Sequence, residues 1–263
     1  MGITRQGKVA VLTNYREEQP QQAVGAQSRG LIVNSWLTSP SPSGTEAEQP
    51  PKQSTRGFVD GVIRSITATK VGGFSLVCGY VNEPLAVVSN RSHDLEQVSW
   101  VATERGQTLG LSNTSFDDRS WPKIVDGERL MDEAIAEHVR AGAGDGAGKD
   151  EDALIQRLLR VLSRDTFPRI PGHATAETHG KYLRNSIFIP VIGQTSTDPC
   201  EDCSKPEPET GSQYTQGPYG TQKQTVLLVR QDGRVRYFER TLYDNDTNAI
   251  PAGRGDRSFE FMT

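Results

Sequence analysis

The apolar residues of this chain gather in short runs that the pattern identifies as strands. The first run, residues 9–12 (VAVL), is typical of a strand buried on both faces. Such a strand needs a neighbour on each side, and we expect one among the later strands and the other upstream of Met1. Runs at 74–80 (FSLVCGY) and 85–91 (LAVVSNR) flank a turn and predict a hairpin, followed by a shorter strand at 98–101.

Helical spacing of apolar residues appears in three other segments. Residues 58–66 place Phe58, Val62 and Ile66 on one face, with Ser54 or Thr55 as the cap. A second helix, capped by Asp126, follows Trp121-Pro122, and a third runs from Glu151. Strands are then predicted at 186–192 (SIFIPVI) and in a C-terminal hairpin whose two strands, 224–230 and 235–240, flank an Asp-Gly turn.

This order of elements, strands, then helices, then strands, favours an α+β layered domain over a doubly wound sheet. We interpret residues 1–263 as a single domain with three polar interruptions. Residues 38–54 and 194–217 are rich in Pro, Ser, Thr and Glu and predict disordered insertions, because they cannot bury enough surface to offset their ordering entropy. Residues 143–151, rich in Gly, predict a flexible helix–helix linker.

Composition narrows the class of protein. The chain has 29 basic and 33 acidic residues, a net charge of −4, and no basic block, which argues against a nucleic-acid partner. No apolar run approaches the roughly 20 residues that span a bilayer, and no secretory signal is visible. Three cysteines fit a reducing compartment. These features predict a cytoplasmic protein without a transmembrane segment.

Motifs for internal catalysis are weak. The segment AGAGDGAGKDED lacks the glycine and the Ser or Thr that a phosphate-binding loop requires. Cys200 and Cys203 have the spacing of half a zinc site, but we interpret them as incidental cysteines of an insertion. No G-x-S-x-G nucleophile turn is present. We therefore predict no metal, no resident cofactor and no catalytic residue.

Polar residues directly after predicted strands are the best candidates for a ligand pocket: Asn14, Arg16, Asn90, Arg91 and Asn113. Asparagine amides and arginine guanidinium groups at strand ends can hold an oxyanion or a carboxylate. The alternative is that these side chains satisfy loop backbone groups, which asparagine does routinely. Composition alone favours that alternative.

Several segments, in this order, resemble the transport and Golgi organisation 2 family, also called the NRDE-containing proteins. They are GITRQGKVAVLTNYRE, SRG at 28–30, GGFSLVCGY, SNR at 89–91, GLSN at 110–113, WPK at 121–123, NSIFIP at 185–190 and YGTQKQTVLLV at 219–229. The resemblance implies an N-terminal-nucleophile hydrolase fold, a four-layer αββα sandwich. It also implies roles in Golgi organisation, protein secretion and haem trafficking or acyl-lipid handling, with Golgi or mitochondrial association as alternatives to a purely cytoplasmic location.

The sequence departs from that family pattern at its start. The family opens with Met-Cys, the cysteine being the nucleophile, and then an Asn-Arg-Asp-Glu motif, and this sequence has neither. We expect a chain that lacks the first strands and works by binding, with haem or an acyl-CoA or other lipid as cargo. The alternative is an amide hydrolase whose true N-terminus is missing from this sequence. A third interpretation, an adaptor that uses its insertions, rests on composition only. Axial ligation of haem would require Cys78, His173 or His179.

Overall fold

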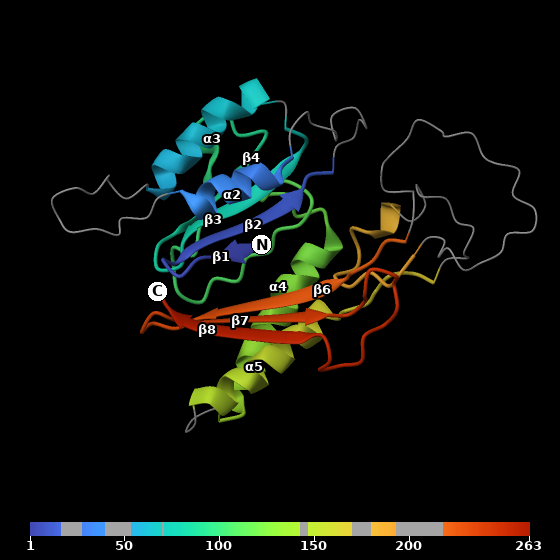
Figure 1. Cartoon of the computed structure of the whole chain (residues 1–263). Helices are drawn as coiled ribbons and strands as arrows, with labels where there is room; N and C mark the ends of the chain where they lie inside the picture. Colours follow the sequence, from blue (N-terminus) through green and yellow to red (C-terminus); the bar gives the residue numbers. More distant parts are fainter. Residues whose placement is uncertain (17–27, 40–53, 70, 143–146, 170–179, 193–217) are drawn as a thin grey trace, which may run out of the picture. The chain divides into compact units, whose positions relative to one another are not determined.

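The computed structural model describes residues 1–16, 28–39, 54–69, 71–142, 147–169, 180–192 and 218–263 (Figure 1). The contacts divide the chain into two compact units. The first comprises Met1–Asp118, Val229–Arg234 and Phe261–Thr263, and the second comprises Arg119–Leu228 and Val235–Glu260. Both contain helices and antiparallel strands, so the predicted α+β class is confirmed.

The first unit contains a five-stranded sheet with the order β1-β2-β3-β4-β5. Its strands are β1 (Gly2–Ile3), β2 (Lys8–Asn14), β3 (Phe74–Tyr80), β4 (Leu85–Ser89) and β5 (Ser99–Val101). The hairpin of β3 and β4 is confirmed, and β3 has the predicted bounds. Strand β2 pairs with β3 along its whole length and with β1 at Val9 and Ala10. All these pairs are antiparallel, so neighbouring side chains stay in register on each face.

Two helices, α2 (Gly30–Thr38) and α3 (Thr55–Thr69), cover one face of this sheet (Figure 1). Trp36 of α2 is fully buried, with its ring centroid 4.9 Å from that of Phe58 and its Nε1 donating to the Val9 carbonyl at 3.0 Å. Ser54 Oγ accepts from the amide of Gly57 at 3.0 Å, which confirms the predicted cap of α3. Burial of one aromatic such as Trp36 contributes roughly 3 kcal/mol or more, so this core anchors α2.

The second unit joins two helices to a three-stranded sheet with the order β6-β7-β8. Its elements are α4 (Pro122–Arg140), α5 (Ala147–Leu162), β6 (Lys223–Val229), β7 (Arg234–Thr241) and β8 (Asp256–Met262). The predicted β6–β7 hairpin is confirmed, with Gly233 at φ 86° in its turn. Ile155, Leu158 and Leu159 of α5 pack against Val226 and Phe238 of the sheet.

Helix starts differ from the sequence prediction. Helix α4 begins at Pro122, and Asp126 lies inside it instead of capping it. Proline suits the first helical position, where its missing N–H is not needed. Helix α5 begins at Ala147, so the predicted linker 143–151 is too long, and its first four residues lie outside the described ones. Once a helix has formed, each further residue that is fixed adds one hydrogen bond, so the helix can include a glycine despite the backbone entropy that glycine loses.

The ends of one predicted insertion are also ordered. Thr38 is the last residue of α2, and Ser39 accepts a hydrogen bond from Lys8. Residues 40–53 and the insertion 194–217 lie outside the described part of the chain.

The prediction of a strand at 186–192 is wrong. This segment forms no strand in the part of the chain that the structure describes, apart from an isolated bridge between Ile192 and Tyr219. Its backbone groups bond to loops instead, since Phe188 N donates to the Arg164 carbonyl at 2.9 Å and Ile189 N to Thr221 Oγ1 at 2.9 Å. Strand β8, in contrast, was not predicted.

Candidate functional site

The five predicted pocket residues lie where strands of the first unit's sheet end, next to the start of β3. Strands β2 and β4 end where β3 begins, because both run antiparallel to it: Asn14 lies opposite Phe74, and Ser89 lies opposite Ser75. We call the residues at this place the polar edge, and they are Asn14, Tyr15, Arg16, Arg29, Gly73, Asn90, Arg91 and Asn113. The structure thus brings the predicted residues together from three separate segments.

Asn113 connects its loop to the end of β2 by two hydrogen bonds. Its carbonyl accepts from the amide of Arg16 at 2.9 Å, and its Nδ2 donates to the carbonyl of Asn14 at 2.8 Å. One residue earlier, the Ser112 carbonyl accepts from Thr13 Oγ1 at 3.1 Å. These bonds join positions 97–99 residues apart in sequence and hold the end of β2 in an ordered loop.

Asn90 likewise forms hydrogen bonds with the backbone at the start of β3. Its Oδ1 accepts from the amide of Phe74 at 3.1 Å, and its own amide donates to the Phe74 carbonyl at 3.4 Å. Asn90 and Asn113 therefore satisfy backbone groups, which is the alternative that composition favoured. Their positions still fix the loops from which the neighbouring arginines project.

Arginine and tyrosine side chains give the polar edge its chemical character. The Arg91 guanidinium lies 4.1 Å from the centroid of the Tyr15 ring, a cation–π contact. Arg29 Nη1 donates to the carbonyl of Gly73 at 2.9 Å. Arg16 and Arg91 are exposed, whereas Tyr15 is half-buried. A guanidinium group held against a ring presents donors whose spacing matches carboxylate or phosphate oxygens.

Sequence reasoning missed Tyr15 and Arg29 as members of the polar edge. The segment SRG at 28–30 carried a signal, because it is one of the segments on which the family resemblance rests. Nothing in its local pattern, however, places Arg29 beside β3, some 44 residues later. The contact depends on the packing of α2 against the sheet.

Cys78 does not suit the role of an axial ligand or a nucleophile. It lies on β3 under the helices, is fully buried, and burial raises the pKa of its thiol to about 12. A thiol with that pKa stays protonated at neutral pH and cannot attack or ligate as a thiolate. His173, His179, Cys200 and Cys203 lie outside the described residues.

Lys123, at the start of α4 in the second unit, also has a strongly shifted pKa. Burial lowers the pKa of its amine to about 8, and its Nζ lies 5.3 Å from the centroid of the Trp121 ring. At neutral pH most copies of this side chain remain protonated. The charge then rests on the aromatic face, a contact within the WPK segment.

Within the residues that the structure describes, no group of three or more His, Cys, Asp or Glu side chains could hold a metal ion. Among the described helices, none combines the length and the apolar character needed to cross a membrane.

Comparison with known proteins gives a consistent result. The family model described as Transport and Golgi organisation 2 matches residues 1–244. The mouse Transport and Golgi organization 2 homolog is 27% identical over 253 residues, covering 94% of this chain and 73% of the mouse protein. The bovine homolog is 28% identical over 251 residues, covering 94% of this chain and 72% of its own length. The human homolog is 27% identical over 249 residues, with the same coverage as the bovine one. This chain belongs to the Transport and Golgi organisation 2 family.

Proposed function

We propose that the chain acts by binding, in Golgi organisation and protein secretion, and that the polar edge holds the anionic end of a lipophilic cargo. The observation that carries this proposal is the contact of the Arg91 guanidinium with the Tyr15 ring, beside Arg16 in the same segment and Arg29, which donates to the Gly73 carbonyl. Their shared ligand chemistry is a carboxylate or phosphate group beside an apolar or planar body. Haem, with its propionates, and acyl-CoA, with its phosphates, both have this form.

The properties of Cys78 support anchoring through the anionic groups. Because its thiol is buried and protonated, Cys78 is not available for haem iron. Arginines instead recognise propionates or phosphates through charge-assisted hydrogen bonds. The asparagines keep a positioning role, since Asn90 and Asn113 hold the loops that carry Arg91 and Arg16.

A binding titration tests the proposal. Haem is titrated into the full chain and followed by absorbance, and palmitoyl-CoA is titrated in parallel by calorimetry. Loss of a charge-assisted hydrogen bond costs roughly 1.5–3 kcal/mol, so Arg16→Ala with Arg91→Ala should weaken binding roughly tenfold or more. Arg91→Lys keeps the positive charge but loses the paired N–H donors of the planar guanidinium. Arg56→Ala, at an exposed position on α3, serves as the control.

Two comparisons make the result decisive. Haem dimethyl ester lacks the propionate charges and should bind the wild type and the double variant equally. Tight palmitoyl-CoA binding with weak haem binding would assign the phosphate as the anion, and the reverse would assign the carboxylate. Unchanged affinity of the double variant for both ligands, with unchanged folding, would overturn the role of the polar edge.

A cellular assay addresses the broader role. In cells that lack their own family member, the wild-type chain should restore secretion of a reporter protein, and the Arg16→Ala, Arg91→Ala variant should not. Immunofluorescence of the chain in the same cells shows its location, for which we propose the cytoplasm with Golgi association. Restoration by both forms would separate the secretory role from the polar edge.

The finer fold assignment is also a proposal. Each unit pairs two helices with one antiparallel sheet, so each supplies the two kinds of layer that an αββα sandwich requires. We propose this sandwich for the single domain 1–263. A crystal structure in which the two sheets are not stacked would contradict it.

A further inference from the structure

Strand β8 forms one edge of the second unit's sheet and has an unusual surface. The order β6-β7-β8 ends with it, so only one side of β8 pairs with another strand of the described chain (Figure 1). Its side chains are exposed on both faces: Phe259 is 57% exposed and Met262, on the opposite face, is 59% exposed. Edge strands are normally protected, because an exposed apolar edge invites pairing with another strand.

The register of β7 and β8 shows which backbone groups point outward. Thr241 N donates to the Gly255 carbonyl at 3.0 Å, and Thr263 N donates to the Gly233 carbonyl at 3.0 Å. Both bonds fit one antiparallel register, in which Phe259 lies opposite Tyr237. Arg257, Phe259 and Phe261 therefore direct their backbone groups at β7, and the alternate positions, which include Asp256, Ser258 and Met262, direct theirs away from it.

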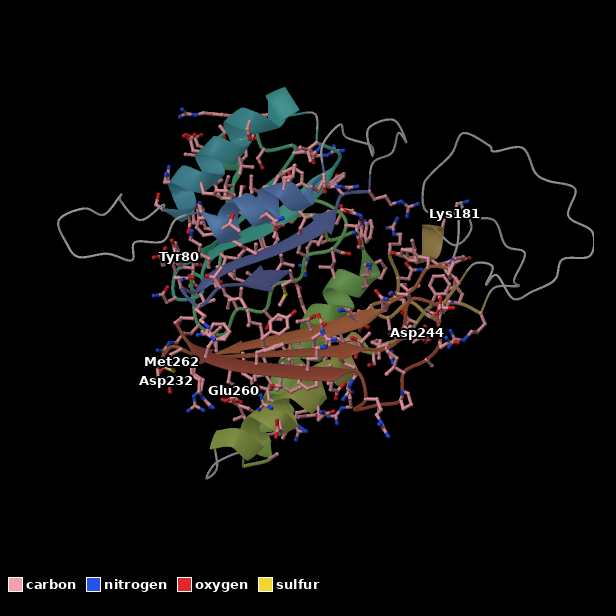
Figure 2. All side chains as sticks on the ribbon, viewed as in Figure 1. Tyr80, Lys181, Asp232, Asp244, Glu260 and Met262 are labelled. Carbon is pink, nitrogen blue, oxygen red and sulfur yellow. The ribbon has the colours of Figure 1, made fainter. Side chains whose placement is uncertain are left out.

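Two carboxylates of β8 contact arginines of β7. Arg240 of β7 forms a bidentate salt bridge with Asp256, in which Nε donates to Oδ1 and Nη2 donates to Oδ2, each at 2.8 Å. Arg236 Nε lies 3.5 Å from Glu260 Oε1. Figure 2 shows Glu260 and Met262 near the C-terminal end of β8. Because these carboxylates are paired with β7, they repel an approaching strand less than free carboxylates would.

On the other face of β8, Phe259 contacts Tyr237, with ring centroids 6.2 Å apart, and leaves more than half of its surface exposed. This aromatic side chain sits at the middle of the strand, between Arg257 and Phe261. A strand with an aromatic centre and balanced charges is suited to pair with a copy of itself.

We propose that β8 pairs antiparallel with β8 of a second copy of this chain, so that the two three-stranded sheets become one six-stranded sheet. A twofold axis perpendicular to the sheet keeps the same face of both copies on the same side. Three registers of the two β8 strands then pair most of their residues. Centring the pair on Ser258 places Asp256 opposite Glu260, and centring it on Glu260 places two Glu260 side chains opposite each other. Like charges directly opposite are destabilising, so both are disfavoured.

The register centred on Phe259 has no such conflict. It places Phe259 opposite Phe259, Arg257 opposite Phe261, Ser258 opposite Glu260 and Asp256 opposite Met262. Aromatic pairs and a cation beside an aromatic ring are favourable cross-strand neighbours. It also makes hydrogen-bonded pairs from the residues whose backbone groups point away from β7, as required.

Analytical ultracentrifugation of the full chain tests the proposal. The wild type should sediment as a dimer at high micromolar concentration. Ser258→Pro removes an N–H that points away from β7, so it should abolish the dimer and leave the monomer with the circular dichroism and Tm of Ser258→Ala, which also lacks the hydroxyl that accepts from Arg236. Ser258→Ala keeps that N–H and should remain dimeric. A monomeric wild type, or a dimer that survives Ser258→Pro, would overturn the proposal.

Cross-linking tests the register. In a background with Cys200 and Cys203 replaced by serine, Phe259→Cys places two thiols opposite each other in a non-hydrogen-bonded pair, about 4.5 Å apart at Cα. Oxidised glutathione should convert them into an intermolecular disulfide, with reduced glutathione as the other product. Phe261→Cys should not cross-link, because its partner is Arg257. The opposite pattern would rule out the Phe259-centred register.

Discussion

Lys8 is a fully buried lysine that forms hydrogen bonds with backbone carbonyls at the C-terminal end of helix α2. Its Nζ donates to the carbonyls of Trp36 at 3.3 Å and Ser39 at 2.9 Å, and to Ser39 Oγ at 2.6 Å. The same nitrogen lies 4.8 Å from the centroid of the Trp36 ring. Burial lowers the pKa of Lys8. The carbonyls at the C-terminus of a helix carry partial negative charge, which a cation stabilises.

We expect Lys8→Met to destabilise the protein by roughly 1–3 kcal/mol, because the half-buried Ser39 carbonyl and the buried Trp36 carbonyl both lose the Lys8 donor, although Ser39 Oγ still donates to Trp36. Urea denaturation of the full chain measures this loss. Arg5→Met, in the exposed turn before β2, is the control and should change the free energy of unfolding by less than about 0.5 kcal/mol. Equal stability of the two variants would mean that Lys8 contributes no more than a surface lysine.

The segment 186–192 illustrates, at the level of elements, how a side chain can replace a strand partner. Ser186 is fully buried, and its Oγ accepts from the amide of Thr166 at 2.9 Å and donates to the Phe188 carbonyl at 2.6 Å. Pro190 has no N–H to contribute to a sheet. The apolar run therefore becomes an ordered loop, despite its strand-like composition.

Ser186→Ala should cost roughly 1–3 kcal/mol, because the Thr166 amide loses its acceptor in a partly buried place. Thermal unfolding followed by circular dichroism gives the comparison. The matched change Ser35→Ala, on the exposed side of α2, removes a hydroxyl that bonds only at the surface and should be close to neutral. A Tm for Ser186→Ala equal to that of Ser35→Ala would contradict the bridging role of Ser186.

At the scale of the whole molecule, the two units are stabilised by different kinds of contact. The first unit has a large core in which Trp36 packs on Phe58 and Tyr80. The second adds a network centred on Arg236, which contacts Glu151 and Asp152 of α5 and Glu260 of β8. The side chains of Arg236 and Glu151 are only 14% and 9% exposed, so this one contact of the network ties α5 to the sheet away from water.

We expect Arg236→Met to destabilise the second unit selectively, by roughly 3 kcal/mol, since it withdraws a cation from beside a buried carboxylate. Hydrogen exchange measured by mass spectrometry should show faster exchange in α5 and β7 and little change in β3. Arg254→Met, in an exposed loop of the same unit, is the control. Equal acceleration in β3 would show that the two units unfold as one.

The sequence alone determined the elements whose pattern is local. Strand β3, the β3–β4 and β6–β7 hairpins and the Ser54 cap were predictable, because alternating or helical apolar spacing and turn residues act over a few positions. The ordered set of short segments was likewise enough to predict the family. The fold class followed from the order of the elements.

Only the tertiary structure decided what depends on contacts between distant segments. It turned 186–192 into a loop through Thr166, Thr221 and Arg164, and it brought Arg29 and Tyr15 to the polar edge. It also gave Asn90 and Asn113 backbone partners. Backbone groups in a buried place bond to whichever donor or acceptor the packing brings near, and local sequence spacing does not specify that partner.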